Sequence, residues 1–140
     1  MTLKISTIKI GDTYSEKVCS NLSRTQIVQY AGASGDFNPV HHDQPYTEHI
    51  AGYPSVFAHG MLTMGMTGKM LTNYVGDGRL TNFGVRFTAQ VFPGATLTAT
   101  ATVTNIRQEN SEGIVDMDVS TVDDNGVEVI NGKASARLDP

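Results

Sequence analysis

The chain has 140 residues, a net charge of −4 and 39% hydrophobic residues, a composition that predicts one globular domain over residues 1–140 with its own core. It carries no basic stripe and no aromatic stacking platform, which argues against nucleic acid as a partner. Because no apolar run approaches the roughly 20 residues that span a bilayer and the N-terminal stretch lacks a signal-peptide core, we expect a cytoplasmic protein without membrane contact.

The first third of the chain predicts a short strand followed by a helix. Residues 14–18 follow a Gly-Asp turn and have the pattern of a strand. Ser23 stands at a helix N-cap position with Gln26 three residues later, which is a capping-box pattern and predicts a helix over Arg24–Ala33. The following Ser-Gly pair at residues 34–35 ends that helix.

The middle of the chain predicts an overhanging segment and then a long buried helix. Residues 37–55 are expected to form a loop-and-helix flap across the main body, with Asp43 capping its short helix. The stretch Met61–Val75 is apolar on nearly every side, which is typical of a helix buried all round. Because Gly65 and Gly68 weaken a helix, we expect another backbone to approach it closely there.

The remainder of the chain predicts an antiparallel sheet. Its signals are strand patterns, a type II turn sequence and an Asn-Gly hairpin, at residues 83–89, 92–94, 96–105 and 125–126. The expected fold is therefore α+β: a four-strand meander with an extra N-terminal strand, curved around a central buried helix. Since an open sheet has exposed edges, we expect a dimer with a continuous sheet.

The stretch Ser34–His42, with the sequence SGDFNPVHH, carries the residues best suited to chemistry. Pro39 fixes its own φ angle and biases the preceding residue away from helix, so the loop is stiff and extended. Inside this stretch, Asp36 and His41 are separated by four residues. A carboxylate beside an imidazole commonly moves protons at neutral pH, so these two residues predict a proton-transfer site.

Four motifs taken together resemble one known family. They are YAGASGDFNPVH at residues 30–41, AHGMLT at 58–63, VRF at 85–87 and PG at 93–94. They resemble the MaoC-like hydratases, which are (R)-specific enoyl-thioester hydratases with the hotdog fold. Within that family the pattern is similar to the β subunits of mycobacterial (3R)-hydroxyacyl-ACP dehydratases. The resemblance runs from about Ile8 to the C-terminus.

The resemblance implies a hydro-lyase that hydrates trans-2-enoyl thioesters of CoA or acyl carrier protein (ACP), or dehydrates (3R)-hydroxyacyl thioesters. It implies that Asp36 and His41 are the catalytic pair and that Asn38 holds their loop. The backbone N–H of Gly60 would meet the thioester carbonyl, and His59 would either bind substrate or anchor the turn before the helix. The resemblance further implies that two hotdogs share one sheet, as a homodimer or a heterodimer.

One departure from the family concerns the support of the catalytic carboxylate. Several members that use CoA carry a serine on the central helix that hydrogen-bonds this carboxylate. The matching position here is Gly68, beside Thr67, so that threonine, a water molecule or nothing takes the role.

Two rival functions remain beside the hydratase. One is a hotdog thioesterase, and the other is a subunit of a heteromeric dehydratase that needs a partner hotdog. The residues leave open the acyl chain length, the thioester carrier, the pathway, the direction of the reaction and which of the pair is the acid.

No cofactor and no metal are expected. His41, His42 and Asp43 stand together, but adjacent residues in an extended chain point apart. Cys19 is the single cysteine, which excludes a cysteine-type zinc cluster and an internal disulfide. His42 and His49 are expected to be solvated or packing residues.

Overall fold

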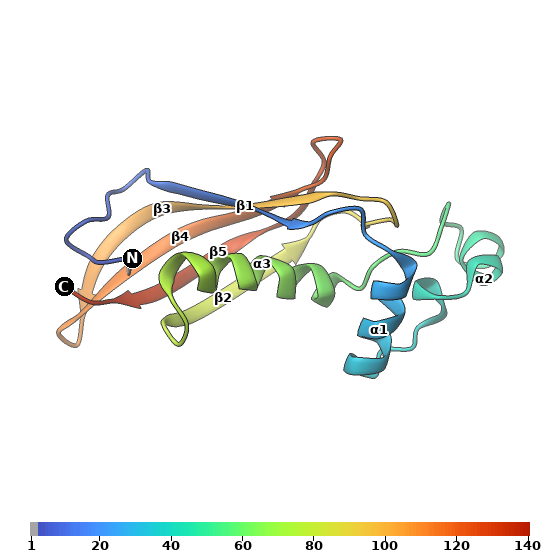
Figure 1. Ribbon diagram of the computed structural model, residues 1–140, viewed down its shortest axis with the longest axis horizontal. Helices are drawn as coiled ribbons and strands as arrows, with labels where there is room; N and C mark the ends of the chain where they lie inside the picture. Colours follow the sequence, from blue (N-terminus) through green and yellow to red (C-terminus); the bar gives the residue numbers. More distant parts are fainter. Residues whose placement is uncertain (1–2) are drawn as a thin grey trace.

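A five-stranded antiparallel sheet curves around one long helix in the computed structural model, which describes residues 3–140 (Figure 1). The strands are β1 (Thr13–Cys19), β2 (Leu80–Phe87), β3 (Leu97–Glu109), β4 (Glu112–Val122) and β5 (Glu128–Leu138). The helices are α1 (Arg24–Ser34), the short 3₁₀ helix η1 (Pro39–His41), α2 (Gln44–His49) and the long α3 (Gly60–Val75). The expected α+β hotdog architecture is therefore confirmed.

The order of the strands differs from the prediction. The sheet runs β1-β3-β4-β5-β2, so only β3, β4 and β5 form a meander, and the four-strand meander is wrong. The segment between β2 and β3 does not close a hairpin, because its Val91 carbonyl accepts from the backbone N–H of Ala58 before α3, at 2.8 Å. Periodicity identifies a strand but not its partner, and here β2 pairs along β5 instead.

The core lies between α3 and the inner face of the sheet. Leu97, Ala99, Ala101 and Val103 alternate along β3 and are all buried, which confirms the period-two pattern. Ala99, Ala101 and Val103 pack with Met70 and Leu71 of α3 and with the inward residues of β4 and β5. Leu97 belongs to a second cluster, with Ile27 of α1 and Val129 of β5. Small residues on β3 let the helix lie close to the sheet.

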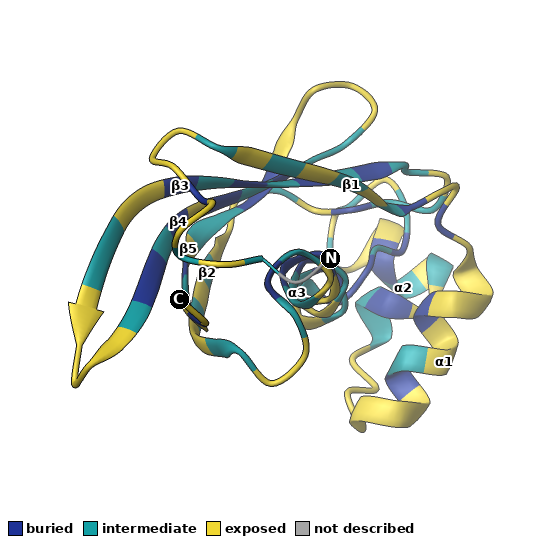
Figure 2. Cartoon of the chain, turned by 60° about the vertical axis from the view of Figure 1, so that its left-hand side comes forward, coloured by how far each residue is buried: buried dark blue, intermediate teal, exposed yellow. Residues whose placement is uncertain are grey.

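Helix α3 is buried on one face and not all round. Its buried residues are Thr63, Thr67, Met70, Leu71 and Val75, which share the side toward the sheet. On the other side Met61 is 57% exposed and Gly65 has no neighbour for an added Cβ within 4 Å. Gly68 packs against the ring of Phe83 and not against a backbone, so both expectations about this helix are wrong within the single chain. The sheet covers only one side of the helix (Figure 2).

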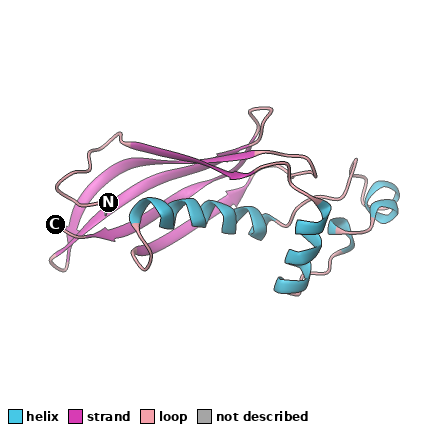
Figure 3. Ribbon diagram, in the orientation of Figure 1, coloured by secondary structure: helices cyan, strands magenta, loops and turns pink. Residues whose placement is uncertain are grey.

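The short helices gather at one end of the molecule. Figure 3 shows α1, η1 and α2 beyond the N-terminal end of α3, so this segment overhangs the end of the sheet and does not lie across the main body. The predicted caps are confirmed, because Ser23 Oγ accepts from the Gln26 N–H and Asp43 Oδ1 accepts from the Tyr46 N–H. Within residues 3–140, none of the helices is both long and apolar enough to cross a membrane.

The close approach of β2 to β5 gives a test of the packing. An added Cβ at Gly132 would collide with the Gly84 carbonyl oxygen and lie 2.8 Å from the Val85 Cα. Because backbone cannot move aside cheaply, Gly132→Ala is expected to lower the free energy of unfolding by about 1–3 kcal/mol or more, measured by urea denaturation. Gly84→Ala on the paired strand is the matched control, since nothing lies within 4 Å of its added Cβ. Equal losses in the two variants would contradict this packing.

Candidate active site

The loop after α1 is shaped by hydrogen bonds from side chains to nearby backbone. Gly35 ends the helix in the left-handed region, at φ 77°. Ser34 Oγ accepts from the Asp36 N–H at 3.1 Å, and Asp36 Oδ1 accepts from the Asn38 N–H at 3.2 Å. Asn38 Oδ1 in turn accepts from the Val40 N–H at 3.2 Å and caps η1. These local bonds are the turn chemistry of Ser, Asp and Asn. They lead the loop into η1, so Pro39–His41 form a 3₁₀ turn and not the extended chain that was expected.

This loop brings Asp36 and His41 face to face. Asp36 Oδ2 lies 3.8 Å from His41 Nε2, and the two side chains are 53% and 9% exposed, respectively. The other ring nitrogen, His41 Nδ1, lies 2.7 Å from the Phe57 carbonyl oxygen. Because a carbonyl only accepts, we assign the ring hydrogen to Nδ1, which leaves the Nε2 lone pair facing the carboxylate.

The surroundings of His41 favour its neutral form. Burial, the largest effect, lowers the pKa of His41 below 6.5, against the opposing influence of the Phe57 carbonyl and the Asp36 carboxylate. The facing atoms, Nε2 of the neutral His41 imidazole and Oδ2 of the Asp36 carboxylate, are then both acceptors. At 3.8 Å they do not bond each other, but they can share one molecule that donates two hydrogens, such as water.

The titration of His41 is a direct test of this environment. We expect its imidazole signals in an NMR pH titration to have a midpoint below 6.5. Denaturation in urea should return the midpoint to about 6.5, the value of an exposed histidine. Between these two midpoints the unfolded chain binds more protons, so the contribution of His41 to stability rises with pH. A folded-state midpoint above 6.5 would mean that the carboxylate outweighs burial.

The start of α3 completes the site. His59 is the N-cap residue, is 2% exposed, and places Nε2 3.0 Å from the Asp36 carbonyl oxygen. Its ring stacks on that of His41, with the ring centroids 3.7 Å apart and the planes 22° from parallel. Within residues 3–140 the Gly60 N–H, at the first helical position, donates to no protein acceptor. Such N–H groups at the positive end of a helix dipole suit a partly negative oxygen.

Gly60 borders a pocket of about 250 Å³ that is also lined by Phe57, the residue whose carbonyl contacts His41, although neither Asp36 nor His41 lines it. The lining combines polar and apolar groups and includes Phe57, Thr63, Phe87 and Val91. A Cβ at Gly60 would lie 3.0 Å from the Phe87 ring, so the glycine lets this ring pack over the helix start.

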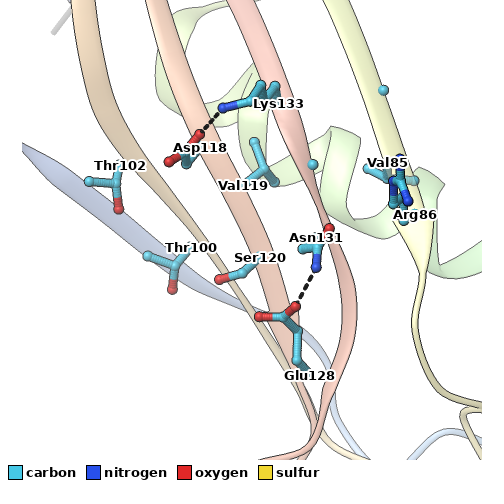
Figure 4. Close-up of a pocket in the computed structure, with 12 residues that line it drawn as sticks. Val85, Arg86, Thr100, Thr102, Asp118, Val119, Ser120, Glu128, Asn131 and Lys133 are labelled. Carbon is cyan, nitrogen blue, oxygen red and sulfur yellow. Dashed lines mark hydrogen bonds and ion pairs between the residues drawn. The ribbon is translucent and has the colours of Figure 1, made fainter.

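A larger pocket, of about 670 Å³, lies elsewhere. It is formed by residues of β2 to β5, including Thr100, Ser120 and Asn131, and no residue of the pair lines it (Figure 4). Its charged groups are partly paired with each other, as in the contact of Lys133 Nζ with Asp118 Oδ1 at 2.8 Å.

The neighbouring residues His41, His42 and Asp43 do not form a metal-binding cluster among the described residues. His42 Nε2 lies 3.1 Å from the Phe37 carbonyl oxygen. Instead, Asp36, His41 and His59 place one potential ligand atom each within 4.8 Å of one another. Nearly parallel imidazoles direct their lone pairs side by side, whereas a zinc ion must lie about 2.0–2.1 Å from each nitrogen. This stacked geometry fits proton transfer better than a shared metal.

The support of the carboxylate differs from the helix serine of the family. Thr67 Oγ1 contacts Thr121 Oγ1 at 2.7 Å and donates to the Thr63 carbonyl at 3.0 Å, so its hydroxyl is used within the core. Of the three alternatives for this support, Thr67 is therefore the one that the structure contradicts. The Asn38 N–H supports the Asp36 carboxylate instead.

Sequence reasoning did not identify Phe57 and Tyr30 as part of the site. Phe57 holds His41 through its backbone carbonyl, a role that leaves no mark on residue type. The ring of Tyr30 lies edge-on to that of His59, with centroids 4.8 Å apart. Tyr30 opens the first of the family motifs, so its position was the available signal.

Comparison with known proteins shows a matching family model and several relatives. Residues 6–125 match the family model described as the MaoC like domain. A stretch of 102 residues is 34% identical to the (R)-specific enoyl-CoA hydratase of Rhodospirillum rubrum and covers 71% of this chain and 70% of that protein. Another match, over 67 residues, is 42% identical to 3-hydroxyacyl-thioester dehydratase Y of Mycobacterium tuberculosis; it covers 46% of this chain but spans only 23% of that relative.

The fold is also shared with a solved structure. R-hydratase PhaJ1 from Pseudomonas aeruginosa matches with a TM-score of 0.84 at 23% identity, over 99% of this chain and 88% of that one. At this identity the likeness concerns the fold alone. The family model, by contrast, matches most of the chain and includes the loop of Asp36 and His41 and the start of α3. The chain therefore belongs to the MaoC-like domain family.

Proposed function

We propose that this chain is a hydro-lyase that adds water to trans-2-enoyl thioesters to give the (3R)-hydroxyacyl product, or catalyses the reverse dehydration. The observation that carries the proposal is the Asp36–His41 pair at 3.8 Å beside a helix start whose Gly60 N–H meets no acceptor in the described part of the chain. The names of the two curated relatives, a hydratase and a dehydratase, support this reaction class.

The proposed chemistry follows from the hydrogen positions. A water molecule donates to Asp36 Oδ2 and His41 Nε2, which holds its oxygen toward the β-carbon of the substrate. As the C–O bond forms between the water oxygen and the β-carbon, the pair takes one proton from the water and passes that proton on to the α-carbon, where the electrons of the C=C bond accept it. Charge that develops on the thioester oxygen meets the Gly60 N–H, a donor already oriented by the helix. The same steps in reverse expel water from a 3-hydroxyacyl thioester.

We further propose that a second hotdog chain completes the site, as a homodimer or a heterodimer through a shared sheet. Phe87 is 52% exposed and Met61 is 57% exposed, and both flank Gly60. In the single chain, β1 and β2 are the edges of the sheet. A partner sheet at an edge would satisfy its free backbone groups and cover these side chains. The molar mass from light scattering tests this directly, and a monomer at assay concentration would contradict it.

The decisive experiment is loss of enoyl-thioester ultraviolet absorbance with crotonyl-CoA and a longer trans-2-enoyl-CoA, followed by chiral analysis. Formation of the (R)-3-hydroxyacyl-CoA supports the proposal, whereas the (S) product contradicts it. Release of free thiol would instead identify a thioesterase. Turnover with the ACP thioester alone would assign the carrier. Activity that arises only with an added hotdog chain would identify the heteromer.

A further inference from the structure

His59 contacts every part of the proposed machinery although it is almost fully buried. Its Nε2 lies 3.0 Å from the backbone carbonyl of Asp36, and since that carbonyl only accepts, Nε2 carries the hydrogen. Its ring stacks on the His41 ring at 3.7 Å between centroids. The His59 side chain, at the start of α3, therefore contacts both Asp36 and His41.

The same residue sets the direction of the Gly60 N–H. That N–H belongs to the peptide unit whose carbonyl is that of His59. The His59 carbonyl accepts from the N–H groups of Leu62 and Thr63, at 3.1 and 3.4 Å. Since a peptide unit is planar, fixing this carbonyl fixes the N–H on the opposite side of the plane. The His59 backbone thus aims the oxyanion donor while its side chain holds the pair.

The burial of His59 costs free energy, because one of its ring nitrogens is buried without a hydrogen-bond partner among the described residues. It is 2% exposed, and within residues 3–140 its Nδ1 has no hydrogen-bond partner. An unpaired buried polar atom costs about 1–3 kcal/mol. A purely apolar residue would fill this space without that cost, but it could not donate to the Asp36 carbonyl.

We propose that His59 is the positioning residue of this site: it acts without touching substrate and holds Asp36, His41 and the Gly60 N–H in one fixed arrangement. This inference rests on the proposed hydratase function for its kinetic part only. The groups that face the ring are Tyr30, Asp36 and His41, and His42 lies next along the chain from His41. A hydrogen on Nε2 satisfies the contact with the Asp36 carbonyl.

Two substitutions separate the two side-chain contacts. His59→Phe keeps a flat ring over His41 but removes the donor to Asp36. His59→Gln keeps an amide N–H at a similar reach but removes the stacked ring. Because a displacement of about 1 Å can cost roughly 100-fold in rate, we expect each variant to lower kcat by about 10–100-fold. KM should change by less than about threefold, since uniform substrate binding is not altered.

A measurement without substrate keeps the test independent of the proposed reaction. NMR signals of the His41 imidazole are expected to move in both variants, most in His59→Gln, where the neighbouring ring is lost. The exposed His49→Gln is the matched control and should leave these signals and kcat unchanged. If the native protein shows no hydration, the hydratase proposal fails, while the His41 signals still decide whether His59 positions the pair.

Three outcomes would overturn the inference. The first is a native kcat in both variants, and the second is a raised KM at native kcat, which would make His59 a substrate contact. The third is an unchanged set of His41 signals in both variants. Should either variant fail to fold, Tyr30→Leu provides another route, because it removes the edge-on ring that holds His59. It is expected to shift the His41 signals and lower kcat, and native values would count against the inference.

Discussion

Asp36→Asn and His41→Ala are each expected to lower kcat for enoyl-thioester hydration by about 10²–10⁴-fold, the usual contribution of one general acid–base group. Asparagine keeps the oxygen that accepts from the Asn38 N–H, so the loop is retained while the carboxylate is lost. His41→Ala removes the imidazole that faces it at 3.8 Å. Steady-state kinetics with crotonyl-CoA give both numbers.

The double variant sharpens this prediction. If the two groups share one water molecule, removing the second after the first should cost far less than the product of the single losses. Asp77→Asn and His49→Ala are matched controls, because both residues are exposed and neither belongs to the loop. Far-UV circular dichroism checks that the fold survives. Near-native activity in both single variants would refute the assignment of the pair.

The parts of the site that could be predicted from the sequence are those held by local chemistry. Asp36 and His41 lie within six residues of each other, and the turn residues between them fix the loop through bonds to neighbouring backbone. The caps at Ser23 and Asp43 form for the same reason. Residue type and spacing decide such features, since no distant part of the chain is needed.

The features that sequence reasoning missed depend on distant contacts. His59 was expected in the site, but its contacts were not: it lies 23 positions from Asp36, and only the fold brings its ring onto His41. Phe57 acts through a backbone carbonyl, which every residue possesses. The pairing of β2 with β5 depends on a connection that bonds to the segment before α3. The sequence pattern predicts that α3 is an apolar helix, but it cannot show which side of the helix the sheet leaves exposed.

Removal of the Gly60 N–H is the second change expected to abolish most of the activity. Direct substitution is confounded, because a side chain at Gly60 would press on the Phe87 ring at 3.0 Å. Phe87→Ala first makes room. In that background Gly60→Ala keeps the N–H, whereas Gly60→Pro deletes it. Proline suits the first helical position, and the ψ of 134° at His59 suits a residue before proline.

The ratio of kcat between these two double variants measures the contribution of the N–H at residue 60. We expect Phe87→Ala/Gly60→Pro to be about 10²–10³-fold slower than Phe87→Ala/Gly60→Ala, which corresponds to about 2.7–4 kcal/mol for one oxyanion donor. Both carry a side chain of modest size at residue 60, and both lack the Phe87 ring, so helix start and pocket are closely matched. Equal rates would show that the developing charge is met elsewhere. The N–H of Met61, the next one along the helix and without an acceptor among residues 3–140, would then be the donor to test.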